Sequence, residues 1–189
     1  RQVVMWNAKR LVGVEAQTGE RLWAYEWAMR RTDQNTATPC YANGRFYLGG
    51  ENRGMRSVGV RKSAAGWEVE ERWRMNELAL DMSSPVLVEG KLFGFSHYRR
   101  GKLFCQDAAT GEVLWTAGDR IGKNVMFHAA GGSVVALVDG GELLVLEAAG
   151  EGFREVRRYD VEGGETWTPP VLLPDGVLVK GRERLVRLR

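Results

Sequence analysis

Short apolar segments recur along the whole chain, and many of them alternate apolar with polar residues. The stretch from Pro85 to Phe95 is typical, because two such segments, Pro85–Val88 and Lys91–Phe95, flank a turn that contains Gly90. Alternation at every second residue indicates a strand with one buried face, and glycine marks tight reversals of the chain. No stretch shows the period of a long amphipathic helix. The pattern predicts a meander of antiparallel strands in an all-β protein.

Two phrases repeat along the chain. "EAQTGERLW" (15–23) and "DAATGEVLW" (107–115) share an acid, Thr-Gly and Trp at identical spacing, 92 residues apart. "TPCYANGRFY" from Thr38 and "SPVLVEGKLF" from Ser84 share a proline and a turn glycine. These turn glycines and those of two weaker copies are spaced by 46, 42 and 44 residues, at Gly44, Gly90, Gly132 and Gly176. A period of about forty residues is the length of one four-stranded propeller blade.

Each repeat predicts four strands, which in the third unit are Pro85–Val88, Lys91–Phe95, Lys102–Gln106 and Glu112–Thr116. The first unit begins at its second strand and the last ends after its third, so we expect 18 strands in five units, at about 1–35, 36–81, 82–123, 124–165 and 166–189. The chain is therefore predicted to be one partial β-propeller domain, 1–189, of about four four-stranded antiparallel blades. We interpret it as the C-terminal half of a propeller of roughly six to eight blades. A complete four-bladed ring is the alternative.

The repeated nine-residue phrase predicts a turn followed by a packing residue. Between the third and fourth strands Gly tolerates a positive φ, Thr can bond the local backbone, and the acid can accept backbone N–H groups. The Trp then offers a large flat surface to the neighbouring blade. We call these the blade-motif residues: Glu15, Thr18, Gly19 and Trp23 in the first unit, Asp107, Thr110, Gly111 and Trp115 in the third, and Trp73 in the same column of the second.

These residues resemble the pyrroloquinoline-quinone-like (PQQ-like) repeat, whose blade signature is an acid, two spacer residues, Thr-Gly, three more residues and Trp. "DAATGEVLW" matches fully, and "EAQTGERLW" has Glu for Asp. The second unit lacks Thr-Gly, and the fourth, "EAAGEGFREV", lacks both Thr-Gly and Trp. The resemblance implies a propeller fold.

Two branches of that family imply different functions. Quinoprotein dehydrogenases bind the quinone and calcium on the propeller axis, typically above a pair of adjacent cysteines. The non-catalytic branch, similar to the propeller lipoprotein of the outer-membrane β-barrel assembly machinery, uses the blades as an interaction scaffold. Cys40 and Cys105 lie 65 residues apart, without a Cys-Cys pair or C-x-x-C-H, and are expected to be two buried thiols.

These absences favour the scaffold branch. The expectation is a non-enzymatic propeller without a cofactor or metal, which binds protein or peptide partners in the periplasm or outside the cell, and whose parent protein is lipid-anchored or secreted. A fragment of a PQQ-dependent dehydrogenase is the first alternative. A sensor domain tethered to a membrane protein is the second.

Composition and charge argue against nucleic-acid binding and against a membrane-spanning segment. The 189 residues are 44% hydrophobic and 27% charged, which is ordinary for a globular protein. The net charge of +3 arises from basic residues spread among acids, so no nucleic-acid footprint is predicted. The longest uncharged apolar run, His128–Val138, is too short to cross a bilayer.

Few residues are candidates for chemistry. His128, on the predicted innermost strand of the fourth unit, is the better ligand candidate, although a structural histidine is favoured. His97, beside Tyr98, Arg99 and Arg100 in a loop, is either a polar contact for a partner or an anionic ligand or, as favoured, part of a solvent-exposed hairpin tip.

Two further patterns receive structural interpretations. Glu70-Glu71 is interpreted as exposed strand-edge charge rather than an acid and base couple. The stripe Trp23, Tyr25 and Trp27 alternates onto one strand face, where packing between blades is the default and an exposed aromatic surface for a peptide or sugar is the alternative.

Overall fold

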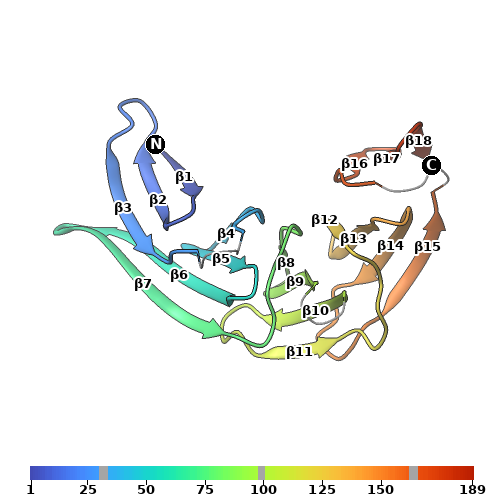
Figure 1. Ribbon diagram of the computed structural model, residues 1–189, viewed down its shortest axis with the longest axis horizontal. Helices are drawn as coiled ribbons and strands as arrows, with labels where there is room; N and C mark the ends of the chain where they lie inside the picture. The colour runs from blue at the N-terminus through green and yellow to red at the C-terminus, as the bar shows by residue number, and fades with distance from the viewer. Residues whose placement is uncertain (30–33, 98–100, 162–165) are drawn as a thin grey trace.

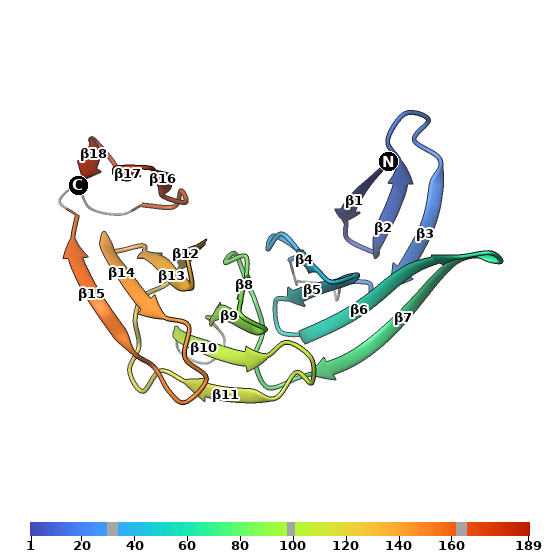
Figure 2. The ribbon, with the colours of Figure 1, turned by 180° about the vertical axis from the view of Figure 1, so that it is seen from behind.

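The computed structural model describes residues 1–29, 34–97, 101–161 and 166–189, and every regular element among them is a β-strand. The strands form five antiparallel sheets in chain order, which stand side by side along an open arc (Figures 1 and 2). The prediction of an all-β propeller with about four blades is confirmed.

The sheets contain three, four, four, four and three strands, and we number them from the N-terminus. Sheet 1 contains β1 (Gln2–Trp6), β2 (Arg10–Glu15) and β3 (Arg21–Glu26). Sheet 2 contains β4 (Cys40–Ala42), β5 (Arg45–Gly50), β6 (Gly54–Ser63) and β7 (Gly66–Met75). Sheet 3 contains β8 (Val86–Val88), β9 (Lys91–Ser96), β10 (Lys102–Asp107) and β11 (Val113–Thr116). Sheet 4 contains β12 (Val125–Ala130), β13 (Ser133–Val138), β14 (Glu142–Glu147) and β15 (Glu155–Asp160), and sheet 5 contains β16 (Val171–Leu173), β17 (Gly176–Lys180) and β18 (Leu185–Leu188).

Strand order follows chain order within every sheet, so each strand pairs with the strands next to it in sequence. In the three four-stranded sheets the first strand lies on the inner side of the arc and the fourth on the outer side (Figure 1). Two-residue turns join the first two strands of sheets 2 and 3, and both residues of each turn have positive φ, as such hairpins require: Asn43 (51°) with Gly44 (73°), and Glu89 (48°) with Gly90 (76°).

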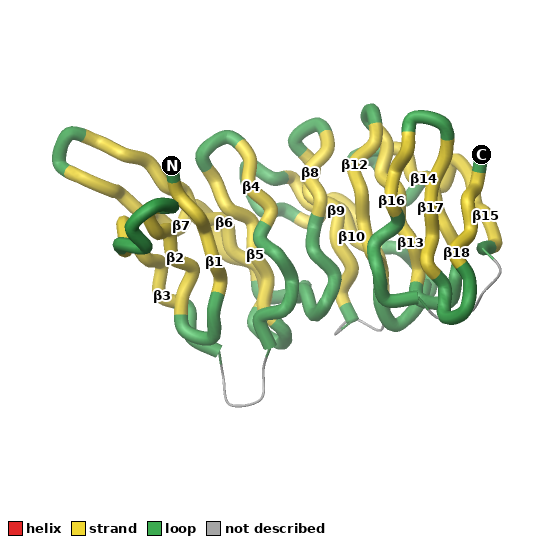
Figure 3. The backbone as a smooth tube through the Cα atoms, turned by 90° about the horizontal axis from the view of Figure 1, so that it is seen from above, coloured by secondary structure: helices red, strands yellow, loops and turns green. Residues whose placement is uncertain are grey.

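The β6–β7 hairpin is longer than the others, with ten residues in each strand. Its pairing with β5 ends at Gly59, whereas its own two strands stay paired to Ser63 and Gly66. The end of the hairpin therefore projects beyond the rim of the arc (Figure 3).

A β-bulge interrupts the outer ladder of each of the first four sheets at the same place. The register shifts lie between Gly13 and Val14, Ser57 and Val58, Cys105 and Gln106, and Val145 and Leu146. An extra residue on the outer strand reverses the faces of the residues that follow it. In the first three sheets the residue just after the bulge is Trp23, Trp73 or Trp115, and its ring packs with residues of the following sheet.

Apolar layers fill the spaces between neighbouring sheets. Separate clusters join sheets 1 and 2, 2 and 3, 3 and 4, and 4 and 5. Phe93, Phe104 and Leu144 are among the fully buried side chains. Removing this apolar area from water is the main contribution that holds the sheets together.

Gly94→Ala tests how closely sheet 3 is packed. A Cβ at position 94 would overlap the ring of Phe104 on the paired strand β10. We expect a loss of about 1–3 kcal/mol in the free energy of unfolding, measured by urea denaturation. Gly118→Ala is the matched control, because a Cβ there meets nothing within 4 Å. Equal effects of the two substitutions would contradict the close packing of Gly94 against the Phe104 ring.

Candidate functional site

The Thr-Gly turn of sheet 3 is closed by its own side chains. Asp107 Oδ1 accepts the backbone N–H groups of Ala109 and Thr110, each at 2.8 Å, and the hydroxyl of Thr110 at 3.1 Å. The bond from the Thr110 N–H is the main cause of the lowered pKa of Asp107. Gly111 has a φ of 80°. These residues shape a hairpin turn.

The equivalent turn of sheet 1 has similar backbone geometry. Gly19 has a φ of 73° and donates its N–H to the Glu15 carbonyl at 2.9 Å. The Thr18 hydroxyl accepts the N–H of Glu20 at 3.2 Å. Thr18 and Gly19 therefore lie where a reversal of the chain needs them. The predicted bonds from backbone N–H groups of the turn to the Glu15 carboxylate are not formed among the described residues, and its Oε2 is buried without a hydrogen-bond partner.

Two of the motif tryptophans bind the turn of the following sheet. The indole N–H of Trp73 donates to the Ala108 carbonyl at 3.0 Å, and that of Trp115 donates to the Ala149 carbonyl at 3.0 Å. A Cβ on Gly111 would lie 2.6 Å from the Trp73 ring, so this position needs glycine for contact as well as for φ.

Trp23 behaves differently. Its indole N–H donates to Gln2 Oε1 within its own sheet at 2.7 Å, while its ring lies 5.6 Å from that of Phe46 in sheet 2. All three tryptophans thus lie at contacts between sheets, but only Trp73 and Trp115 hydrogen-bond across them.

Arginine and tryptophan side chains join sheet 1 to sheet 2. The rings of Trp6 and Trp27 stack with centroids 5.5 Å apart. The guanidinium of Arg53, a residue only 6% exposed, lies 4.7 Å from the Trp27 centroid and 5.7 Å from that of Trp6. Arg53 also donates to the carbonyls of Trp27 and Ala28. The aromatic stripe packs into this interface, whereas the two arginines that join it, Arg53 and Arg56, were not predicted.

The interpretation of Glu70-Glu71 as exposed strand-edge charge is wrong for Glu71. Neighbouring residues of a strand face opposite sides, and Glu71 faces sheet 1, where its carboxylate accepts a hydrogen bond from the Tyr25 hydroxyl and lies 3.6 Å from Arg56 Nε. Burial raises the pKa of Tyr25 to about 12, and the bond to Glu71 adds to this. Burial also acts to raise the pKa of Glu71, but the bonds from Tyr25 and Arg74 together with the positive charges nearby lower it overall.

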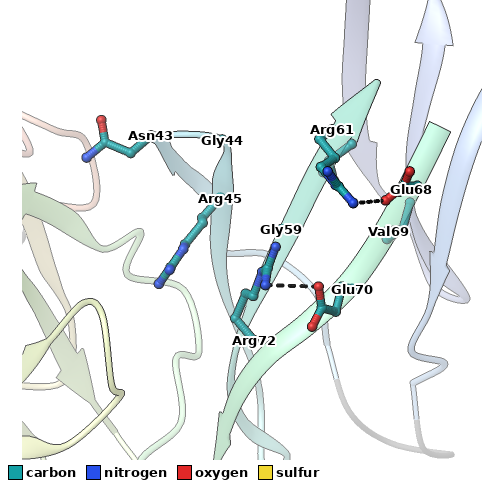
Figure 4. Close-up of a pocket in the computed structure, with 10 residues that line it drawn as sticks. Asn43, Gly44, Arg45, Gly59, Arg61, Glu68, Val69, Glu70 and Arg72 are labelled. Atoms are coloured by element: carbon teal, nitrogen blue, oxygen red, sulfur yellow. Dashed lines mark ion pairs between the residues drawn. The ribbon is translucent and has the colours of Figure 1, made fainter. Parts of the chain in front are cut away.

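A polar groove lies on the other face of the same hairpin, which is the face toward sheet 3. Its volume is about 430 Å³ (Figure 4). The β4–β5 turn and β5 supply Asn43, Gly44 and Arg45, and the projecting hairpin supplies Gly59, Val60, Arg61, Glu68, Val69, Glu70 and Arg72. Three guanidinium groups and two carboxylates therefore line one concave surface.

The carboxylates of this groove are already paired. Glu68 pairs with Arg61, and Glu70 lies 2.9 Å from Arg72 Nη1. Arg45 forms no ion pair with the residues that the structure describes, and its Nη1 donates to the Ala109 carbonyl at 3.3 Å. Gly59 lies under Arg72, since a Cβ there would be 2.7 Å from Arg72 Nε. We call this surface the arginine groove.

Neither of the two histidines lines the arginine groove. His128 lies on β12, the innermost strand of sheet 4, and its Nε2 is buried without a hydrogen-bond partner among the described residues. His97 Nδ1 lies 3.2 Å from the Lys123 carbonyl, beside a small cavity of about 40 Å³. Tyr98, Arg99 and Arg100 lie outside the described residues.

Among the described residues, the cysteines and the acidic side chains do not gather at a metal site. Cys105 is fully buried, which raises the pKa of its thiol to about 12, and Cys40 is half-buried, which raises its pKa in the same direction. Both are free thiols. Within residues 1–29, 34–97, 101–161 and 166–189, no group of three His, Cys, Asp or Glu side chains could hold a metal ion.

Comparison with known proteins shows the family to which this propeller architecture belongs. The sequence model of the family described as outer membrane protein assembly factor BamB matches residues 1–117. The chain belongs to the BamB family. Its PQQ-like repeats are therefore those of a propeller family, as the blade motif predicted. No curated protein sequence matches the chain.

The fold is also similar to a solved member of the BamB family. The crystal structure of BamB from Moraxella catarrhalis superposes with a TM-score of 0.76 at 15% sequence identity, over 99% of this chain. At this identity the likeness concerns the fold. The chain spans 53% of the length of the Moraxella protein. In the part of this chain that the structure describes, no helix is long and apolar enough to cross a membrane.

Trp73→Ala tests the contact between sheets 2 and 3. Trp73 is 9% exposed and bonds across the interface, so we expect a loss of about 3–5 kcal/mol in the free energy of unfolding. Trp167 is 48% exposed, and Trp167→Ala should change the stability by about 0.5 kcal/mol or less. Chemical denaturation followed by circular dichroism measures both variants, and similar losses would refute the assignment of Trp73 as an interblade anchor.

Tyr25→Phe tests the half-buried hydrogen bond between Tyr25 and Glu71 through its pH dependence. Because folding raises the pKa of Tyr25 from 10.0 to about 12, the neutral phenol stabilises the fold fully below pH 10, and this contribution is lost as the pH rises from 10 toward 12. The stability difference between the original chain and Tyr25→Phe should therefore shrink over that range. Urea denaturation at a series of pH values measures it, and a difference that stays constant contradicts the assignment.

Proposed function

We propose that the chain is part of a non-enzymatic β-propeller scaffold that binds protein or peptide partners in the cell envelope, in the periplasm or outside the cell. Membership of the BamB family supports this, since the family is described as an outer-membrane protein assembly factor. The length of the Moraxella BamB chain supports the further proposal that residues 1–189 form one partial domain of a larger propeller.

The projecting β6–β7 hairpin is the structural feature that best supports the proposal. Val60, Trp67 and Val69 pack against the apolar cluster between sheets 1 and 2, so this face of the hairpin is held by the fold. The opposite face lines the arginine groove (Figure 4). A projecting element that is fixed on one side and charged on the other is suited to contact a partner.

The charged groups of the arginine groove favour recognition over catalysis. Both carboxylates that line it are held in ion pairs with neighbouring arginines. Guanidinium groups bind anionic groups through several directed hydrogen bonds. The groove is thus suited to select a partner by charge and shape.

Site-specific photo-crosslinking in the producing cell tests this function. A photoreactive amino acid at Ala64, at the exposed tip of the β6–β7 hairpin, should yield a discrete covalent adduct with an envelope protein. The same amino acid at Lys9, in the exposed β1–β2 turn at the opposite rim, should not (Figure 3). Fractionation of the cell before analysis reports the compartment. The absence of an adduct from position 64, or equal adducts from both positions, would refute the proposal.

A further inference from the structure

We propose that the arginine groove binds an extended acidic segment of a protein partner, with Arg45 as the principal contact to a carboxylate of that segment. The inference rests on the proposed scaffold function and specifies the chemistry of the partner. It is drawn from the charges, the hydrogen bonds and the strand edges that meet in this groove.

The balance of charge favours an anionic ligand. Arg45, Arg61 and Arg72 face two carboxylates, Glu68 and Glu70, and each carboxylate has its own arginine. Arg45 is thereby left without an anionic partner among the described residues. A guanidinium has five N–H donors in a planar fork, which matches the two oxygens of a carboxylate.

Arg45 is also held in place before any ligand arrives. Its Nη1 donates to the carbonyl of Ala109, which belongs to the Thr-Gly turn of sheet 3, and this turn is fixed by Asp107. The guanidinium therefore spans the space between sheets 2 and 3, and it retains donors for a ligand. An arginine that is already ordered loses less side-chain entropy when it binds.

The groove also offers a strand edge. Pairing of β5 with β6 ends at Gly59, and the Val60 N–H donates to the Gly44 carbonyl, whereas β6 continues to Ser63. Residues 61–63 therefore have β7 on one side and no described strand on the other. An extended peptide can use such an edge while its side chains reach the groove.

The two carboxylates argue for a protein segment rather than a nucleic acid. A phosphate backbone presents closely and regularly spaced negative charge, and some of it would face Glu68 or Glu70. A peptide with alternating acidic and apolar residues can direct its carboxylates to Arg45 and Arg72 and leave neutral groups beside the glutamates. The alternation also suits an extended strand.

Fluorescence anisotropy with labelled octapeptides tests the inference on the 189-residue chain. An alternating Glu-Val peptide should bind saturably, and an alternating Lys-Val peptide should not. Arg45→Glu should weaken binding of the Glu-Val peptide about tenfold or more, because a charge-assisted pair is replaced by repulsion. Raising the salt concentration should weaken binding to the original chain.

Arg157→Glu is the matched control. Arg157 is exposed on β15 and forms no ion pair with the described residues, so this variant has the same change in net charge at a distant site. It should bind the Glu-Val peptide nearly as the original chain does. Arg45→Gln, which removes the charge with less disturbance, should also weaken binding, and circular dichroism checks that each variant is folded.

Three outcomes overturn the inference: equal effects of Arg45→Glu and Arg157→Glu, equal binding of the two peptides, or a single-stranded oligonucleotide that binds more tightly than the Glu-Val peptide. The crosslinking experiment separates this inference from the scaffold function. An adduct from position 64 that persists in Arg45→Glu leaves the scaffold function standing and overturns the acidic ligand. Loss of every adduct, including that of the original chain, overturns both.

Discussion

The β-bulge in the outer ladder is the constraint on which the packing of this arc depends. In a regular strand, Trp73 would lie on the same face as Glu71 and point back toward sheet 1. The bulge between Ser57 and Val58 reverses that face, so the indole reaches the Ala108 carbonyl of sheet 3. Because Trp115 is turned in the same way toward Ala149, one local irregularity, repeated, links sheet 2 to sheet 3 and sheet 3 to sheet 4.

The residue opposite each tryptophan shows how the bulge is accommodated. Trp23, Trp73 and Trp115 pair with Gly13, Ser57 and Cys105, all of which are small. Sheet 4 keeps the bulge but has Arg157 after it, opposite Val145. The side chain of Arg157 is exposed, so the contact between sheets 4 and 5 depends on the apolar cluster around Leu137 and Val179 instead.

The interface between sheets 1 and 2 combines two kinds of contact. Trp23 supplies apolar area, but its indole bonds within its own sheet. Cation–π contacts of Arg53, in the β5–β6 turn, and of Arg56, on β6, with Trp27 add to this interface. Burying a guanidinium is costly, and carbonyl acceptors and aromatic faces offset that cost for Arg53. This interface lies next to the projecting hairpin, whose apolar face continues the same cluster through Trp67.

The sequence by itself determined the strands, the tight turns and the repeat, because alternation and glycine act within a few residues. The four strands of sheet 3 begin and end within one residue of the predicted positions. The Thr-Gly turn is local in the same sense, since Asp107 and Gly111 lie four residues apart. Tertiary structure alone decided which way residues near a bulge face, as Trp73 shows, because a register shift depends on the paired strand. It also decided the arginine groove, since Arg45, Arg61 and Arg72 come together only through the pairing of β5, β6 and β7, and no local pattern marks their proximity.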